Sequence, residues 1–133
     1  MKRTDRVWRD VVALVMNTRG DWRRAVTEAT GMPFSRVRAL SRLERESLSL
    51  RALAHAMACD APAATVAVND LEQRGLVQRR PHPDDRRAKL AVITPAGRRM
   101  MAVVARVHDA LPPQLVGLGA EDLAALERVF SAR

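Results

Sequence analysis

The sequence predicts a mainly α-helical chain with one small β-hairpin, and three observations support this prediction. Apolar residues recur at helical spacing over most of the 133 residues. Between residues 76 and 94 the pattern changes to two short strands on either side of a charged, proline-containing turn. Apolar residues make up 47% of the chain, which is enough to build a hydrophobic core at this length. The simplest organisation is a single domain over residues 1–133.

Two helices are predicted at the N-terminal end. Apolar side chains recur at helical spacing over residues 4–29, and Gly20 is a candidate kink or break in that helix. The Gly-Met-Pro sequence at residues 31–33 ends it and begins a second helix, which is expected to reach residue 46. Residues 47–49 follow as a candidate short strand.

Two short amphipathic helices come next, over about residues 50–58 and 61–74. In each of them, apolar residues recur at positions i, i+3, i+4 and i+7. Ser49 and Asp60 are the predicted N-caps, because their side-chain oxygens can accept the free N–H groups of the first turn. Gly75 is the predicted glycine that closes the second helix. Two such helices joined by a tight turn form a helix-turn-helix.

A β-hairpin is predicted directly after this helix pair. Its strands are Leu76–Arg80 and Leu90–Thr94, and its tip, Pro81–Lys89, is long and charged. Thr94 then caps a long helix that begins at Pro95, since proline suits the first helical position. The element order is therefore mainly α with a small β-wing, a winged helix-turn-helix flanked by helices.

The flanking helices are expected to mediate dimerisation. The long helix from residue 95 is expected to continue to the Pro-Pro pair at residues 112–113, and a last short helix covers Ala120–Ser131. These helices are long and apolar for a monomer of this size. We therefore assign residues 33–99 to the winged helix-turn-helix, and residues 1–32 and 100–133 to dimerisation helices.

Positive charge is concentrated in two blocks of the chain. The formal net charge is +8, with eleven basic and five acidic residues in 1–45 and eight against two in 74–99. Concentrated basic charge indicates a polyanionic partner, either nucleic acid or an anionic membrane.

Other classes of protein are disfavoured. Cys59 is the single cysteine, so an intrachain disulfide is excluded, and neither a secretory signal nor a membrane-spanning stretch is present. A cytoplasmic protein with no membrane partner is expected. The three histidines lack metal-ligand spacing, and no nucleophile elbow or phosphate loop occurs, so we expect no enzyme activity, metal or cofactor. Cys59 is either a small core residue, which we favour, or a redox-active thiol.

The charged hairpin fits a role in DNA binding. A recognition helix can occupy the major groove while an adjacent hairpin reaches the minor groove, where an inserted arginine gains most. Arg86 and Arg87 lie near the predicted tip, and Asp84 and Asp85 are expected to orient an arginine fork by a bidentate ion pair. The alternative is a solvated turn whose charges keep a sheet edge soluble.

The chain also resembles a known family over about residues 33–130. The segments "LSLRALAHAM", "DLEQRGLVQRRPHPDDRRAKLAVITPAGRRM" and "LGAEDLAAL" are similar to the multiple-antibiotic-resistance (MarR-type) winged-helix regulators. The match in order and spacing is strongest at Arg74–Val77, Asp85–Arg87 and Thr94–Gly97. The resemblance implies a cytoplasmic homodimer that binds a palindromic DNA site and is often released by a small ligand or by oxidation. It also places Asp85 and Arg87 on the family's paired Asp and Arg of the wing, and Arg86 at the tip.

The outward face of the second helix of the pair is expected to contact bases. Its residues are Ala61, Pro62, Thr65, Val66, Asn69 and Gln73. The family usually has Ser, Thr and Arg here, whereas only Thr65, Asn69 and Gln73 of this chain can hydrogen-bond a base edge. Asn and Gln suit adenine, and apolar side chains pack on the thymine methyl group. We therefore expect either an A·T-leaning site or weak base discrimination with affinity dominated by phosphate contacts.

Phosphate contacts are expected from the start of the first helix of the pair, at Ser49 and Arg51. Arg36, Arg38 and Arg42 are either further DNA contacts or surface charges that favour solubility.

Three functions remain open on the sequence alone. The first is a homodimeric repressor that binds a palindromic operator in double-stranded DNA and is released by a small-molecule effector. The second is a non-specific architectural DNA-binding protein. The high net charge and a recognition helix with few side chains that can hydrogen-bond a base also fit this function. The third is a dimeric small-molecule sensor with weak DNA binding.

Overall fold

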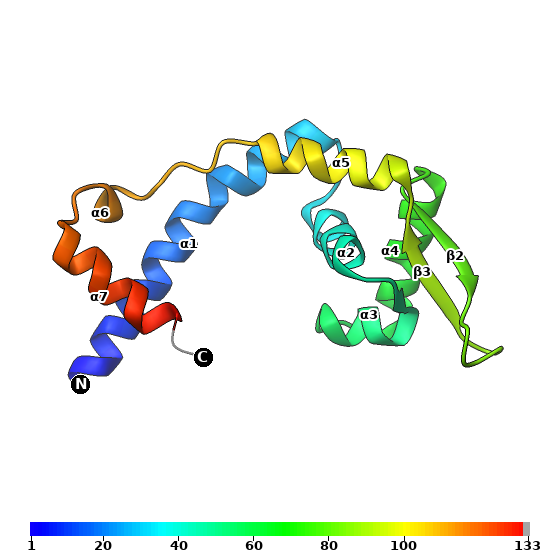
Figure 1. Ribbon diagram of the computed structural model, residues 1–133, viewed down its shortest axis with the longest axis horizontal. Coiled ribbons are helices and arrows are strands. Elements are labelled where there is room, and N and C mark those ends of the chain that lie inside the picture. Colours follow the sequence, from blue (N-terminus) through cyan, green and yellow to red (C-terminus); the bar gives the residue numbers. More distant parts are fainter. Residues whose placement is uncertain (132–133) are drawn as a thin grey trace. The chain divides into compact units, whose positions relative to one another are not determined.

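The computed structural model describes residues 1–131, which form helices and one small sheet (Figure 1). In chain order the elements are α1 (Arg3–Thr30), α2 (Phe34–Arg45), β1 (Leu48–Ser49), α3 (Leu50–Ala56), α4 (Ala61–Gln73), β2 (Val77–Pro81), β3 (Lys89–Ile93), α5 (Pro95–Arg106), α6 (Pro113–Val116) and α7 (Ala120–Ser131). The chain divides into two compact units. The larger is Arg23–Val107, and the smaller is Met1–Trp22 together with the chain from His108 onward.

The larger unit has a buried apolar core formed by α2, α3, α4 and the sheet. Leu40, Leu53, Val68 and Leu71 are 0% exposed. The buried residues of α4 follow the predicted helical period and are Ala64, Ala67, Val68 and Leu71. This confirms the helix-turn-helix, and it leaves the opposite face of α4 in solvent.

The sheet has three antiparallel strands, in the order β1-β3-β2. The hairpin pairs Val77 with Ile93 and Arg79 with Ala91, and β1 pairs Leu48 with Ala91 on the other edge of β3. The predicted hairpin is confirmed, and the candidate strand at residues 47–49 is present as β1, which pairs with the other edge of β3 and makes the sheet three-stranded. Figure 1 shows the hairpin extending from this sheet beyond α4.

The predicted helix caps are confirmed. The Ser49 hydroxyl accepts from the Ala52 N–H at 3.0 Å, and the Asp60 carboxylate accepts from the Ala63 N–H at 2.8 Å. Gly75 has a φ of 74° and closes α4 in a Schellman arrangement, with its N–H donating to the Glu72 carbonyl. These local hydrogen bonds fix both ends of α4.

The turn between α3 and α4 contains a strained residue. Ala58 has a φ of 52°, a left-handed conformation that costs a non-glycine residue about 1–2 kcal/mol. Its N–H donates to the His55 carbonyl, and the N–H of Cys59 donates to the Ala54 carbonyl, which is the glycine-type helix closure with alanine in its place. Cys59 itself is half-buried.

A close backbone contact joins β3 to α5. The Thr94 hydroxyl donates to the Gly75 carbonyl at 2.7 Å and accepts from the Gly97 N–H at 3.0 Å, which confirms Thr94 as the cap of α5. A Cβ atom on Gly97 would overlap the Leu76 carbonyl oxygen and lie 2.6 Å from Cγ1 of Ile93. Only glycine therefore fits at this position, which gives a physical reason for the Thr-Pro-Ala-Gly sequence.

The flanking helices differ from the sequence prediction in three places. α1 continues through Gly20, because a single glycine costs a helix only about 1 kcal/mol. α5 ends at Arg106 instead of reaching the proline pair. Leu111 precedes a proline, which disfavours helical backbone, and it is 67% exposed, so a further turn would gain little burial. The short helix α6 begins at Pro113, where the sequence pattern predicted only a break.

The smaller unit exposes much of its apolar surface. Within the described residues, α6 and α7 contain no buried residue. The exposed large apolar side chains of this unit are Met1, Val7, Trp8, Val12, Val15, Met16, Leu111, Val116, Leu123, Val129 and Phe130. Arg19 forms an ion pair with Asp109 and also lies over the ring of Trp22 at 4.8 Å. None of the helices described for this chain is both long enough and apolar enough to span a bilayer.

Candidate nucleic-acid interface

The solvent face of α4 carries the residues that the sequence predicts as base contacts. Ala61, Pro62, Val66, Asn69 and Gln73 are exposed, and Thr65 is half-buried. The fold therefore brings all six to one accessible helix face, opposite the buried residues that pack into the core. Their contact with DNA stays a prediction.

Two polar side chains of this face already have partners within the protein. The Thr65 hydroxyl donates to the Ala61 carbonyl at 3.0 Å. The carboxamide oxygen of Asn69 accepts a hydrogen bond from the guanidinium of Arg79 on β2. Each of these side chains therefore has fewer hydrogen-bond donors or acceptors available to another molecule than the free side chain would have.

Arg79 links the wing to α4. Its Nη1 lies 2.8 Å from Glu72 Oε1, and its backbone N–H donates to Glu72 Oε2 at 3.1 Å. In the sequence, Arg79 stands out only as one member of the basic block at residues 74–99. The signal that could have located it is the strand alternation, since Arg79 shares a sheet face with the buried Val77.

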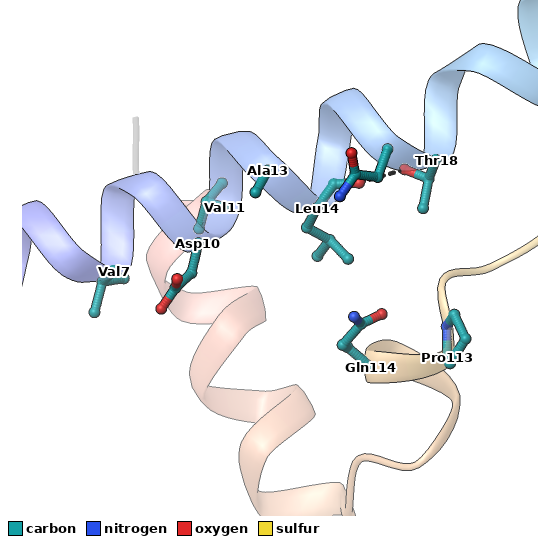
Figure 2. A pocket seen from close by; sticks show the side chains of 9 residues that line it. Val7, Asp10, Val11, Ala13, Leu14, Thr18, Pro113 and Gln114 are labelled. Atoms are coloured by element: carbon teal, nitrogen blue, oxygen red, sulfur yellow. Dashed lines mark hydrogen bonds between the residues drawn. The ribbon is translucent and has the colours of Figure 1, made fainter.

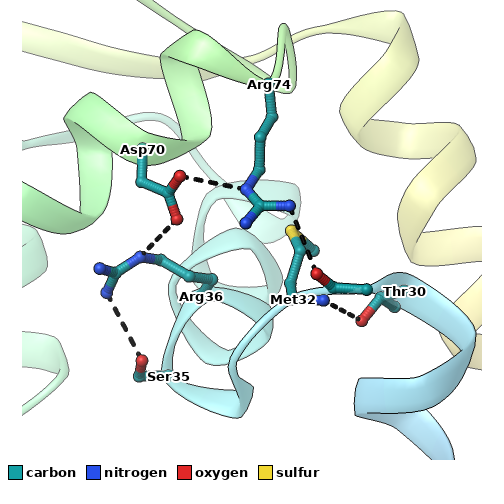
Figure 3. Close-up of polar contacts among 7 residues, drawn as sticks. Thr30, Met32, Ser35, Arg36, Asp70 and Arg74 are labelled. Carbon is teal, nitrogen blue, oxygen red and sulfur yellow. Dashed lines mark hydrogen bonds and ion pairs between the residues drawn. The ribbon is translucent and has the colours of Figure 1, made fainter.

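A second ion-pair group holds the other side of α4. The Asp70 carboxylate accepts from Arg36 of α2 at 2.9 Å and from Arg74 at 3.1 Å, and Arg74 also reaches the Gly31 carbonyl (Figure 3). Burial acts to raise the pKa of Asp70, but the hydrogen bonds and positive charges of Arg36 and Arg74 outweigh it and lower the pKa below the ordinary value.

Arg36 therefore joins α2 to α4 through Asp70, which is neither of the two roles that the sequence left open. Its side chain is only 20% exposed, so it is not a free surface charge. Arg38 and Arg42 of the same helix are exposed.

Backbone hydrogen bonds shape the tip of the wing. The Asp85 carboxylate accepts from the Arg87 N–H at 3.0 Å, and the Asp84 N–H donates to Nδ1 of His82 at 3.1 Å. Arg86 and Arg87 are both exposed. The Asp85 carboxylate and the Asp84 backbone N–H thus stabilise the turn that carries the arginines, while the expected bidentate pairing of Asp84 and Asp85 with an arginine stays a prediction.

A hollow of about 460 Å³ lies between the start of α3 and the wing. It is lined by Ser49, Leu50, Arg51, His82, Asp85, Arg87, Ala88 and Lys89. Because the Ser49 hydroxyl accepts from the Ala52 N–H, its own proton is directed to another acceptor. With Arg51, Arg87 and Lys89 around the same hollow, the arrangement suits an anion such as a phosphate group. His82 and Lys89 were not singled out for phosphate binding from the sequence.

A separate apolar groove lies within the smaller unit. It has a volume of about 700 Å³, and Figure 2 shows Leu14 of α1 directed towards the short helix α6, which carries Pro113 and Gln114. The other residues that line it are Val7, Asp10, Val11, Ala13, Asn17 and Thr18. Among residues 1–131, no group of three or more His, Cys, Asp or Glu side chains is arranged to hold a metal ion.

The helix-turn-helix, the capped α4 and the basic three-stranded wing define a winged helix-turn-helix protein. Residues 35–89 match the family model described as the MarR family. No curated protein sequence matches the chain.

Solved structures share this fold. The chain is similar to the transcriptional regulator BldR from Sulfolobus solfataricus, with 23% identity, a TM-score of 0.68 and coverage of 100% of both chains. It is similar to Sco3205, a MarR family transcriptional regulator from Streptomyces coelicolor solved in complex with DNA, with 22% identity, a TM-score of 0.67 and coverage of 98% and 91%. A MarR family regulator from Rhodococcus sp. RHA1 is 26% identical, with a TM-score of 0.62 and coverage of 97% and 95%.

Proposed function

We propose that this protein is a homodimeric, sequence-specific DNA-binding transcriptional repressor. The recognition helix α4 enters the major groove, and Arg86 and Arg87 of the wing reach the adjacent minor groove. The observation that carries the proposal is the gathering of Ser49, Arg51, Arg87 and Lys89, from two distant chain segments, around one hollow. A DNA backbone phosphate is the anion that such a hollow beside a recognition helix would bind.

A solved neighbour supports this function. Sco3205, which shares the fold, was crystallised in complex with DNA.

The proposed wing contact predicts that alanine at Arg86 or Arg87 weakens DNA binding by about 1–3 kcal/mol. Alanine at Thr65 or Asn69 should instead change the preferred sequence more than the affinity for random DNA. Unchanged affinity in both wing variants would argue against the minor-groove contact.

Dimerisation is supported by the exposed apolar side chains of the smaller unit. Trp8 and Phe130 are 67% and 72% exposed, and large apolar patches of this kind usually mark an interface. A symmetric dimer would present two copies of α4 to a palindromic operator. The apolar groove lined by Leu14 is the candidate site for a small-molecule effector that would release the protein from DNA.

The decisive experiment is a titration of the protein onto duplex DNA from upstream of its own gene, against a shuffled duplex, at two salt concentrations. The proposal expects a preference of at least about 10³ for the upstream DNA, within the usual range for specific binders. Binding to neither duplex would contradict it and favour a dimeric small-molecule sensor.

An architectural DNA-binding protein is the second candidate, and one observation favours it. Thr65 and Asn69 already form hydrogen bonds within the protein, and the remaining α4 face is largely small or apolar. Equal binding to both duplexes with a steep loss of affinity at the higher salt concentration would support this function instead.

A further inference from the structure

An isolated asparagine on a recognition helix can read adenine with both ends of its carboxamide. The oxygen accepts from the adenine N6 amino group, and the nitrogen donates to N7. This two-point contact needs both ends of the carboxamide to be available. In this protein the oxygen of Asn69 is already bonded to Arg79.

The orientation of the Asn69 carboxamide follows from chemistry. A guanidinium group has donors only, so the atom that faces Arg79 must be the oxygen and not the nitrogen. The NH₂ group of Asn69 is then the end that remains for DNA. The carboxamide oxygen has a second lone pair, but the positive guanidinium beside it disfavours another approaching N–H group.

Arg79 is itself held in place, so it does not readily release Asn69. Glu72 binds its guanidinium at 2.8 Å and its backbone N–H at 3.1 Å. The side chain is 22% exposed, and its strand position lies opposite the buried Ala91. The guanidinium therefore joins Glu72 and Asn69, which lie about one turn apart on α4.

We propose that Arg79 is a specificity-determining positioning residue that makes Asn69 a donor-only reader of the major groove. This rests on the proposed sequence-specific DNA binding. Asn69 would favour base edges that present acceptors, such as O6 and N7 of guanine or O4 of thymine, over adenine, whose N6 amino group is a donor beside its single acceptor N7. Thr65 has the opposite character, because its hydroxyl donates to Ala61 and leaves lone pairs and a methyl group for the base.

The test is selection of binding sites from a random duplex library by the full-length protein. Asn69→Ala identifies the base pair that depends on Asn69. Arg79→Met keeps the apolar stem but removes the donors, so adenine at that base pair is expected to rise by roughly fivefold or more relative to guanine and thymine. Arg80→Met is the matched control, because Arg80 is the exposed neighbour on β2 and bonds to Gln78. It should leave the preference within about twofold.

A second variant keeps the inference testable if Arg79→Met fails to fold. Asn69→Asp can still accept from Arg79 but has no N–H to donate. The preference at the Asn69-dependent base pair is expected to disappear in this variant. A preserved preference would mean that Asn69 reads through its oxygen, and the inference would be wrong.

The remaining outcomes separate this inference from the proposed function. If the wild-type protein selects a site but Arg79→Met shows the same base preferences, only the role of Arg79 is refuted. The same holds if Asn69→Ala alters no position. If the wild-type protein selects no site at all, the proposed sequence-specific function fails, and the inference fails with it.

Discussion

The two compact units of this protein differ in how much of their apolar surface they bury themselves. In the larger unit, Leu40, Leu53, Val68 and Leu71 are 0% exposed. In the smaller unit, α6 and α7 bury none of their described residues, and Trp8, Met16 and Phe130 are each at least 67% exposed. The larger unit thus has the core of an independent fold, whereas the smaller one exposes the apolar surface that the proposed dimer interface would cover.

The largest effect is expected from a substitution in the exposed apolar surface of the smaller unit. Trp8→Asp places a charge in the proposed dimer interface, where a large aromatic residue is a natural anchor. We expect the dimer to dissociate at least about 100-fold more readily, measured by sedimentation equilibrium.

Val66→Asp is the matched control for that experiment. Val66 is also an exposed apolar residue, at 56%, but it lies on α4 of the larger unit. In the absence of DNA it should leave the molecular mass unchanged. If both variants changed the dissociation of the dimer equally, the exposed apolar residues of the smaller unit would have no special role in dimerisation.

The next effect concerns the tight contact inside the larger unit. Gly97→Ala adds a Cβ atom that would overlap the Leu76 carbonyl, and because this neighbour is backbone it cannot move away easily. We expect a loss of about 1–3 kcal/mol in the free energy of unfolding, measured with denaturant. Gly20→Ala is the control, since a Cβ there meets no atom within 4 Å, and it should stabilise α1 by roughly 0.5–1 kcal/mol.

The strained turn between α3 and α4 offers a stabilising substitution. Ala58 has a φ of 52°, which glycine adopts without a steric cost. Ala58→Gly is expected to raise the free energy of unfolding by roughly 0.5–1 kcal/mol, after allowance for the greater freedom of glycine in the unfolded chain. A lower melting temperature in this variant would show that the strain is not relieved there.

The smallest effect is the pH dependence contributed by Asp70. Its pKa is lower in the folded protein than the ordinary value of 3.8, so the folded state binds this proton less readily. The stabilisation is fully present above the unfolded pKa and is lost as the pH falls through the folded pKa. Asp70→Asn should cost at most about 1 kcal/mol at pH 7, because the group is partly exposed. Its unfolding free energy should converge towards that of the wild type in acid, and a constant difference at every pH would contradict the ion-pair explanation.

The elements that the sequence predicted best are those set by neighbouring residues. Ser49, Asp60 and Thr94 cap their helices as expected, and Gly75 closes α4, because each depends on atoms within a few residues along the chain. The apolar period of α4 similarly decided which face is buried and which is exposed. This is why the candidate base contacts lie on one accessible face.

The sequence did not predict the contacts that form between residues far apart in the chain. The two basic blocks predict charges that are available to a polyanionic partner, yet Arg79 binds Glu72 and Asn69, and Arg36 binds Asp70 at a separation of 34 residues. Nothing in the local pattern states which arginine will find a carboxylate. The same limit applies to β1, whose pairing with β3 depends on how the hairpin folds back.

By itself, therefore, the sequence determined the order of the elements, their caps and the buried face of each helix, because these follow from backbone geometry and from periods of two to four residues. Only the tertiary structure decided which charges remain available to a partner. A charged side chain several ångströms long binds whichever opposite charge the fold brings within reach, and that neighbour is chosen by the packing of helices and strands that lie far apart in the chain.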